Sequence, residues 1–274
     1  MSVQPARTPS PEPPILLREI VGTVAVLTLN RPAARNSLSE AMIGQLHASF
    51  NAIAEDKRIR AAVIAANGPA FSAGHDMKEL TARRSDPDRG RAYFAEIMNA
   101  CSAMMQAIVR LPKPVIACVQ GTATAAGCQL VASCDLAVAA STAMFATPGV
   151  NIGLFCSTPM VALTRNVSRK AAMEMLLTGD MVSAMEAQRI GLINRVVEPG
   201  TERAAALALG RQIAAKSALT VKTGKEAFYR QLEMNLADAY RYASEVMVEN
   251  MLARDAEEGI GAFIEKRTPS WEDR

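Results

Sequence analysis

The sequence contains only two histidines, His47 and His75, and its five cysteines show no Cys-x-x-Cys or Cys/His spacing. With so few imidazoles, a histidine-based metal site or a Ser/His/Asp triad is hard to build, and we expect no bound metal. The cysteines are odd in number and lie mostly in apolar segments, which favours reduced thiols over a disulfide framework. We therefore predict a reducing, cytoplasmic environment.

Strong charge of one sign and long apolar runs are also missing. The 274 residues carry a formal net charge of +3 without a long Lys/Arg run, so neither nucleic acid nor a membrane surface is an expected partner. No window reaches the roughly 18 apolar residues that a membrane span requires. Aromatic residues make up 4% of the chain, whereas half of all residues are hydrophobic, which predicts a large core packed through small side chains.

The pattern along the chain predicts an α/β protein with three parts. Residues 1–14 are rich in proline and poor in apolar side chains, so we predict a disordered tail, with a short processed leader as the alternative. Strands alternate with amphipathic helices over 15–200, as in a layered parallel sheet. Residues 201–274 are mainly helical and carry apolar stripes, which favours a docking or oligomerisation region. Strands are predicted at 15–19, 23–29, 61–65, 115–119 and 136–139.

Two Ser-x-x-Glu capping boxes predict where helices begin. Ser37 with Glu40 precedes an apolar stripe of helical period, and Ser183 with Glu186 precedes a second helix. In such a box the serine hydroxyl accepts a hydrogen bond from the backbone N–H three residues later. We therefore predict that Ser37 and Ser183 are N-cap residues.

Two small-residue elements carry the strongest functional signal. The first is Phe71-Ser-Ala-Gly-His-Asp-Met-Lys-Glu-Leu80, centred on Gly74, and the second runs from Gln120 into Leu130 through Gly127. Both follow an apolar strand, and their small side chains leave backbone N–H groups accessible to a ligand. We predict that two amide donors converge on one carbonyl oxygen. The alternatives are a simple tight turn at Gly74 and close helix packing at Gly127.

Five motifs in order resemble the enoyl-CoA hydratase/isomerase (crotonase) superfamily over nearly the whole chain after residue 15. They are Leu29-Asn-Arg-Pro with Asn36-Ser-Leu, the Phe71 element, the block from Gly121 to Asp135, Leu177-Thr-Gly-Asp and Phe263-Ile-Glu-Lys-Arg-x-Pro. The resemblance implies a spiral of ββα units followed by a C-terminal helical trimerisation region. It also implies an acyl-CoA thioester as ligand, with the backbone N–H groups of His75 and Ala126 forming an oxyanion hole.

The resemblance also implies the contacts to coenzyme A, which would enter as part of the thioester and not as a covalently bound cofactor. Lys78 matches a position whose ammonium approaches the phosphates, Arg35 offers a cation nearby, and Ala73 is a further expected contact. Phe263 and Lys266 match a place from which an adjacent subunit reaches the nucleotide end. For these two, a core anchor and a solvated charge are the alternative roles. A homotrimer, or a hexamer made of two trimers, follows from the resemblance.

The chain departs from the family pattern at the two acid/base glutamates. Gln129 stands in the first position and Gly149 in the second, and neither side chain exchanges protons at neutral pH. The available substitutes are the imidazole of His75, the thiol of Cys156 and the amide of Asn151, and we expect none of them to act as the base. Three nearby acids, Asp76, Glu79 and Asp135, are instead expected to be structural.

The sequence therefore predicts a protein that processes acyl-CoA thioesters, nominally an enoyl-CoA hydratase of fatty-acid metabolism. Hydration needs a base for the water and an acid for the α-carbon, and each positioned group typically contributes about 10² to 10⁴ in rate. Ordinary hydratase activity is therefore expected to be weak. The alternatives are a non-catalytic acyl-CoA-binding or modulatory protein, and an acyl-CoA decarboxylase that needs only enolate stabilisation.

Overall fold

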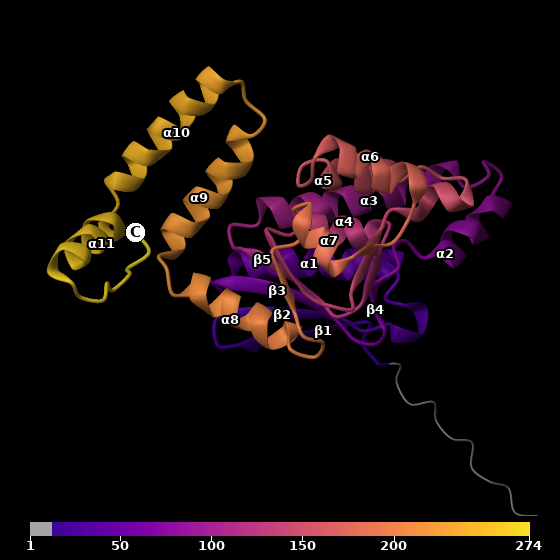
Figure 1. Cartoon of the computed structure of the whole chain (residues 1–274), viewed down its shortest axis with the longest axis horizontal. Coiled ribbons are helices and arrows are strands. Elements are labelled where there is room, and N and C mark those ends of the chain that lie inside the picture. The colour runs from indigo at the N-terminus through magenta and orange to yellow at the C-terminus, as the bar shows by residue number, and fades with distance from the viewer. Residues whose placement is uncertain (1–12) are drawn as a thin grey trace, which may run out of the picture.

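The computed structural model describes residues 13–274, and its central element is a six-stranded sheet (Figure 1). The first two strands form the antiparallel hairpin that the sequence predicts around Gly22, and every other pairing in this sheet is parallel. The predicted tail, apart from its last two positions, lies outside the described residues. In sheet order the strands are β1 (Leu16–Val21), β2 (Val24–Leu29), β3 (Ala61–Ala66), β5 (Val115–Val119), β7 (Leu136–Ala140) and β10 (Arg195–Val197).

A second, smaller sheet lies at the ends of these strands. Three of its strands each follow a strand of the large sheet after a short loop, so the chain repeats a unit of two strands and a helix. Helices α1 (Glu40–Glu55), α3 (Arg91–Arg110) and α4 (Ala126–Ser133) close successive units. The predicted spiral of ββα units is confirmed. In order the strands of the second sheet are β4 (Ala70–Ser72), β6 (Thr122–Thr124), β8 (Met144–Ala146) and β9 (Val182–Ser183).

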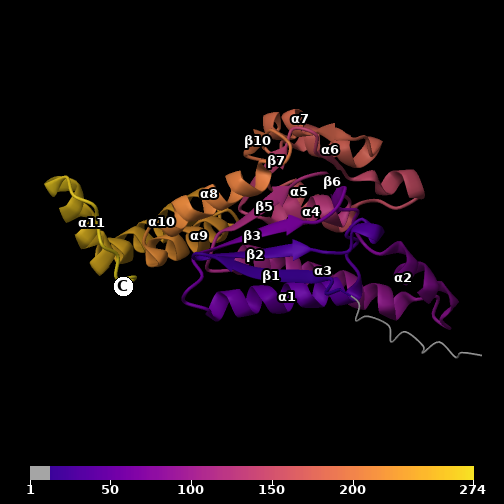
Figure 2. The ribbon, with the colours of Figure 1, turned by 90° about the horizontal axis from the view of Figure 1, so that it is seen from below.

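The large sheet is buried on both faces, which explains why β2, β3 and β5 are almost continuously apolar. Along β2, Ala25 and Leu27 enter the larger core cluster together with α1, α3 and α4, whereas Val24 and Val26 face the other way. That second face is covered by Ala206 and Leu209 of α8 (Glu202–Ala214). Figure 2 shows the sheet between α8 on one side and α1 with α3 on the other.

Shorter helices connect and cover the second sheet. They are the 3-10 turns η1 (Pro32–Ala34), η2 (Arg83–Ser85) and η3 (Pro148–Ile152), and the α-helices α2 (Met77–Ala82), α5 (Ser157–Leu163), α6 (Arg169–Thr178) and α7 (Ala184–Arg189). In the part of the chain that the structure describes, no helix is both long and apolar enough to cross a membrane.

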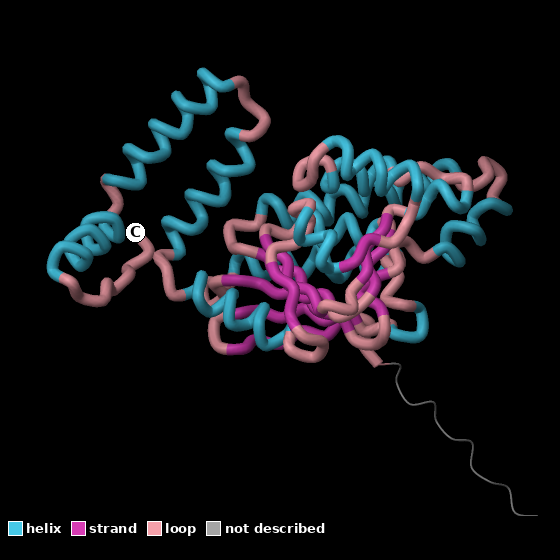
Figure 3. Tube along the Cα trace, viewed as in Figure 1, coloured by secondary structure: helices cyan, strands magenta, loops and turns pink. Residues whose placement is uncertain are grey.

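The last three helices form an arm that extends from the sheet (Figure 3). They are α9 (Ala218–Gln231), α10 (Leu236–Met251) and α11 (Arg254–Glu265). One partly buried ion pair ties the arm to the sheet: Lys225 Nζ lies 2.7 Å from Asp135 Oδ2, and the hydroxyl of Tyr229 donates to Asp135 Oδ1 at 2.9 Å. Asp135 also accepts from the backbone N–H of Val115 at the start of β5, at 2.7 Å. Its predicted structural role is confirmed.

The C-terminal tail folds back against α11 and the end of α8. The indole N–H of Trp271, the only tryptophan in the chain, donates to the carbonyl of Ala215 at 2.9 Å. A Cβ on Gly259 would lie 3.1 Å from the Trp271 ring, so the glycine makes room for it. Arg267 donates two hydrogen bonds to the carboxylate of Glu258, at 2.6 and 2.8 Å, and fixes the turn that leads into this tail.

One of the two predicted N-caps is wrong. Helix α1 is capped by Ser39, whose hydroxyl accepts from the N–H of Met42 at 3.2 Å. Ser37 instead donates its hydroxyl hydrogen to Asp76 Oδ2 at 3.0 Å, a partner 39 residues away that a local pattern does not show. The other cap is confirmed, because the hydroxyl of Ser183 accepts from the N–H of Glu186 at 3.2 Å.

Candidate functional site

The first small-residue element is held against the loop before α1 by an isolated parallel bridge between Leu38 and His75. The N–H of Leu38 donates to the carbonyl of Gly74 at 2.7 Å, and the N–H of Asp76 donates to the carbonyl of Leu38 at 3.3 Å. The bridge uses the carbonyl of Gly74 and the N–H of Asp76, so the N–H of His75 takes no part in it. Gly74 itself has φ +90°, a conformation that strongly favours glycine.

Asp76 fixes the direction in which the chain leaves this element. Its carboxylate accepts from Arg31 Nη2 at 3.1 Å, from the hydroxyl of Ser37 at 3.0 Å and from the N–H of Lys78 at 3.1 Å, which caps α2. Burial raises the pKa of Asp76, but the hydrogen bonds from Ser37 and Arg31 outweigh it, so the pKa falls below its ordinary value. The carboxylate is therefore ionised and fully occupied, which confirms its predicted structural role.

Glu79 is also structural, although it serves a different helix from its own. Its Oε2 accepts from the backbone N–H of Glu40, in the first turn of α1, at 2.9 Å. A carboxylate at a helix N-terminus satisfies an otherwise unpaired donor and the helix dipole. Glu79 therefore joins α2 to α1 and does not point a base at the second small-residue element.

The second element passes from β6 into α4 through a strained alanine. Ala125 has φ 50° and ψ −120°, a region that residues with a Cβ rarely adopt, and its N–H donates to the carbonyl of Ala146 at 3.0 Å. Ala126 is the first residue of α4, so its N–H has no carbonyl of the preceding turn to bond. The strain at Ala125 thus accompanies a backbone amide presented at a helix N-terminus, where negative charge is favoured.

The two elements touch each other through their glycines. An ideal Cβ on Gly74 would lie 2.9 Å from the Cβ of Ala125 and 3.2 Å from the backbone nitrogen of Ala126. A Cβ on Gly127 would lie 2.1 Å from the carbonyl oxygen of Ser72, at the end of β4. The two alternative roles of these glycines, a turn at Gly74 and close packing at Gly127, are both present. The same packing brings the backbone of Gly74 close to the nitrogen of Ala126.

The two small-residue elements also carry buried polar atoms without a partner. Within residues 13–274 four buried side-chain nitrogen or oxygen atoms have no hydrogen-bond partner, and three of them belong to His75 and Gln129. Gln129 is 5% exposed, and its Oε1 is one of the three. The other two are both ring nitrogens of His75, and burial lowers the pKa of this imidazole, which is therefore neutral at neutral pH. These groups have hydrogen-bonding capacity left for a ligand.

The space beside Gly149 is filled from within the chain. The N–H of Gly149 points to the sulfur of Cys156 at 3.3 Å, and an ideal Cβ on Gly149 would lie 2.9 Å from that sulfur and 2.7 Å from the carbonyl oxygen of Leu154. Burial raises the pKa of the Cys156 thiol, so it remains protonated at neutral pH. Cys156 therefore acts as a packing group. Asn151 lies in η3 and is exposed.

The residues expected to contact coenzyme A fall into two groups. Arg35, Ala73 and Lys78 are all exposed around the first element, and the N–H of Ala73 donates to the carbonyl of Arg35 at 3.0 Å. Phe263, which is 84% exposed, and Lys266 lie on and just after α11, at the opposite end of the molecule (Figure 1). One chain therefore brings the first three together and leaves the other two apart from them.

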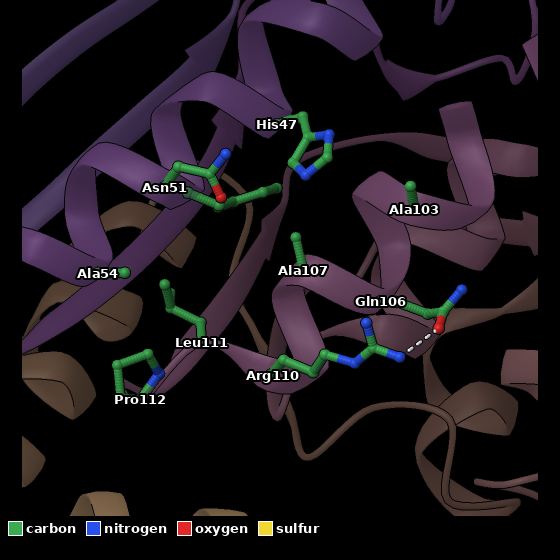
Figure 4. Close-up of a pocket in the computed structure, with 10 residues that line it drawn as sticks. His47, Asn51, Ala54, Ala103, Gln106, Ala107, Arg110, Leu111 and Pro112 are labelled. Carbon is green, nitrogen blue, oxygen red and sulfur yellow. Dashed lines mark hydrogen bonds between the residues drawn. The ribbon is translucent and has the colours of Figure 1, made fainter. Parts of the chain in front are cut away.

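Two hollows in the described residues lie away from these elements. One of about 350 Å³ is lined by His47, Gln106 and Arg110 between α1 and α3, where Arg110 donates to Gln106 at 2.8 Å (Figure 4). A groove of about 520 Å³ borders it and is lined by Glu40, Glu79 and Glu96 among others. Neither contains His75, Ala126 or Gln129, and neither combines unpaired buried polar atoms with amides at a helix start. We therefore place the candidate site at the two small-residue elements. Residues 13–274 show no group of three or more metal-ligating side chains.

Sequence reasoning missed the residues that hold the first element in place. Arg31 bonds both Asp76 and the carbonyl of Ser37, and the fully buried Asn36 donates to the carbonyls of Asn67 and Ala70 at 2.8 Å each. Both residues belong to the motif Leu29-Asn-Arg-Pro with Asn36-Ser-Leu, and this motif is the sequence signal that could have identified them. The two side chains occur in the motif because they support the loop that carries the first element.

Comparisons with known proteins agree on one family. The profile described as enoyl-CoA hydratase/isomerase matches residues 19–274. Enoyl-CoA hydratase domain-containing protein 3, mitochondrial, from Rattus norvegicus is 47% identical over 270 residues, which cover 98% of this chain and 88% of that protein. The crystal structure of the human domain-containing protein 3 has a TM-score of 0.89 at 46% identity and covers 94% of this chain and all of that one. A crystal structure of an enoyl-CoA hydratase from Mycobacterium smegmatis has a TM-score of 0.90 at 52% identity and covers 94% of this chain and 99% of that chain.

Proposed function

Because the chain belongs to the enoyl-CoA hydratase/isomerase family, we propose that it binds acyl-CoA thioesters and polarises the thioester carbonyl with the N–H groups of His75 and Ala126. The observation that carries this proposal is the close contact between the two small-residue elements. A Cβ added at Gly74 would lie only 3.2 Å from the backbone nitrogen of Ala126. Two donors aimed at one oxygen form an oxyanion hole, and each such donor is worth about 2.7 to 4 kcal/mol in a dry site. The helix start at Ala126 adds a favourable dipole.

The chemistry that this arrangement supports best is stabilisation of an enolate. An electron pair that reaches the α-carbon is delocalised onto the carbonyl oxygen, which the two amides then hold. Hydration needs more than this, because a base has to activate water and an acid has to protonate the α-carbon. Gln129 and Gly149 provide neither group, and the buried thiol of Cys156 stays protonated. We therefore propose that hydration of a simple enoyl-CoA is slow.

Decarboxylation of a malonyl-type thioester is the reaction that fits this proposal most directly. The bond between the α-carbon and the carboxylate breaks, carbon dioxide leaves, and the electron pair forms the enolate that the amides stabilise. A proton from solvent then completes the product. No protein carboxylate is required. The rival is a non-catalytic acyl-CoA-binding or modulatory role, which the replacement of both glutamates also supports.

A neighbouring subunit would complete the ligand site. Arg35, Ala73 and Lys78 lie beside the first element, where exposed cations suit the phosphates of coenzyme A. Phe263 and Lys266 would reach the nucleotide end from an adjacent copy in a homotrimer or a dimer of trimers. Support comes from α10, whose apolar residues are strongly exposed in one chain, with Leu236 at 76%. The names of several relatives include "mitochondrial", so the cytoplasmic assignment stays a prediction.

Calorimetric titration with butyryl-CoA and an absorbance assay with crotonyl-CoA test the proposal. We expect saturable binding and hydration far slower than that of an enoyl-CoA hydratase with both glutamates, run in parallel. Release of carbon dioxide from malonyl-CoA would favour the decarboxylase over the binder. Absence of binding to any acyl-CoA, or rapid hydration of crotonyl-CoA, would show that the reading of positions 126, 129 and 149 is wrong.

A further inference from the structure

Helix α11 is buried on one side and strongly exposed on the other. Asp255 and Ala262, seven residues apart and therefore on one face, are 2% and 1% exposed, whereas Phe263 is 84% exposed. The tail of the chain packs next to the buried face, because the ring of Trp271 lies against Gly259 and leaves no room for a side chain there. The tail therefore determines which side of α11 is turned inward.

Residues 271–274, which we call the strap, bind the first turn of α11 through backbone groups. The carboxylate of Asp255 accepts from the N–H of Glu272 at 2.7 Å and from the N–H of Asp273 at 3.0 Å. The N–H of Asp255, one of the helix-start donors without a partner in its own helix, donates to the carbonyl of Arg274 at 3.0 Å. These bonds satisfy a buried carboxylate and a helix-start donor together, so the position of α11 depends on that of the strap.

The strap also holds the joint between α8 and α9, where the arm leaves the sheet (Figure 1). Asp273 Oδ1 accepts from the N–H of Ala218, the first residue of α9, at 2.8 Å, and the other carboxylate oxygen pairs with Arg60. Arg60 lies just before β3 and also donates to the carbonyl of Lys216 at 2.9 Å. The end of the arm is therefore tied back to its beginning and to the sheet.

Resting on the proposed function, in which Phe263 and Lys266 reach the nucleotide end of coenzyme A in a neighbouring copy, we propose that Trp271 and Asp273 are positioning residues for that contact. Because Ala262 is turned inward, Phe263 is turned about 100° away from it, toward solvent. Lys266 ends the helix in a left-handed turn with φ 56°, so α11 sets its place as well. Without the strap, α11 would lose its fixed rotation and these two side chains would no longer be held toward one ligand.

Two thioesters that differ only in the nucleotide provide the test. Butyryl-CoA carries the nucleotide end, and butyryl-4′-phosphopantetheine lacks it, so calorimetric titration of each separates this contact from the rest of the ligand site. In the wild type we expect butyryl-CoA to bind roughly 10- to 100-fold more tightly, the range of one hydrogen bond from a charged group. Light scattering after size-exclusion chromatography gives the oligomeric state of each sample.

Asp273→Gly removes the carboxylate without straining the chain, because Asp273 has φ 60°, which glycine adopts readily. We expect this variant to lose most of its preference for butyryl-CoA and to bind butyryl-4′-phosphopantetheine as the wild type does. Trp271→Phe keeps a ring against Gly259 and removes the indole N–H that bonds Ala215, so it should show a smaller loss of the same kind. This milder variant decides if Asp273→Gly does not fold.

Asp56→Gly is the matched control. Like Asp273, Asp56 accepts a backbone N–H, here that of Arg58 at 3.0 Å, and pairs with an arginine, whose Nη2 lies 2.7 Å from Asp56 Oδ2. Asp56 follows α1 and has no hydrogen bond to the strap or to α11 in the described residues. We expect the control to keep both wild-type affinities.

The outcomes separate this inference from the function on which it rests. Equal losses for the two thioesters in the strap variants would indicate a general structural role and overturn the positioning role, as would unchanged affinities. Dissociation of the oligomer in these variants would assign the strap to assembly and overturn it too. A monomeric wild type, or one that binds the two thioesters equally, would remove the contact from a neighbouring copy and leave acyl-thioester binding intact. Binding of neither thioester by the wild type would remove the proposed function itself.

Discussion

Replacing Gly74 with alanine tests whether close contact between the two small-residue elements creates the binding site. The backbone at Gly74 has φ +90°, and a residue with a Cβ pays about 1 to 3 kcal/mol there. The added methyl would also lie 2.9 Å from the Cβ of Ala125 and 3.1 Å from the carbonyl oxygen of Thr124. Both neighbours are fixed by backbone, so this overpacking adds about 1 to 3 kcal/mol. The total loss of unfolding free energy is about 2 to 6 kcal/mol.

Gly200→Ala provides a matched control for the conformational part of that loss. Gly200 has φ +86°, but a Cβ there would meet nothing within 4 Å. We expect urea unfolding to show a loss of about 1 to 3 kcal/mol for the control and a larger one for Gly74→Ala. Calorimetry should show that the Gly74 variant loses acyl-CoA affinity by more than about tenfold, since the methyl separates the amides at 75 and 126, while the control keeps it. Equal stability losses together with unchanged affinity in the Gly74 variant would refute this reasoning.

Three further predictions follow from single contacts. Ala125→Gly should raise the unfolding free energy by about 1 kcal/mol because it removes strain, whereas an Ala→Gly change within α1 should lower it by a similar amount; a urea titration that shows the same sign for both would contradict this. The hydrogen bonds from Arg267 lower the pKa of Glu258 from 4.5 to about 2, so its support for the tail is complete above pH 4.5 and is lost as the pH falls toward 2. Fluorescence of Trp271 should then shift toward that of an exposed indole over this range, and Glu258→Gln should already show the shift at neutral pH. Identical fluorescence titrations of the wild type and the variant would show that the Glu258 carboxylate does not hold the tail. Gln129→Glu restores one proton-transferring group and should raise crotonyl-CoA hydration by about 10²-fold, and an unchanged rate would mean that this side chain does not reach the substrate.

The sequence predicted the layered fold well because its strands are buried on both faces and therefore read as short apolar runs. It placed the first N-cap wrongly for an equally physical reason. Ser37 and Ser39 both precede the helix, and a local pattern cannot show that Asp76, far along the chain, takes the hydroxyl of Ser37. Long-range hydrogen bonds of this kind decide which of two similar residues caps a helix.

The candidate site was predictable where backbone conformation requires particular residues, and less so where side chains meet. Gly74 and Gly127 are recognisable in the sequence because each stands where only glycine fits. A Cβ at either position would collide with the backbone or the facing side chain. The environment of Gly149 could not be anticipated, because the carbonyl of Leu154 and the sulfur of Cys156 reach it only when the following loop closes. A glutamate placed at position 149 therefore needs movement of that loop as well as the substitution.

The single carboxylate of Asp135 ties the start of β5 to the arm, since it accepts from the N–H of Val115 and pairs with Lys225. A shortened chain that stopped before α8 would uncover one face of the sheet, and one that stopped before α9 would leave this carboxylate buried without its cation. Because β5 leads through β6 into Ala125, such truncation would also loosen the second small-residue element, where the thioester is proposed to bind. A minimal working fragment therefore has to extend beyond Tyr229.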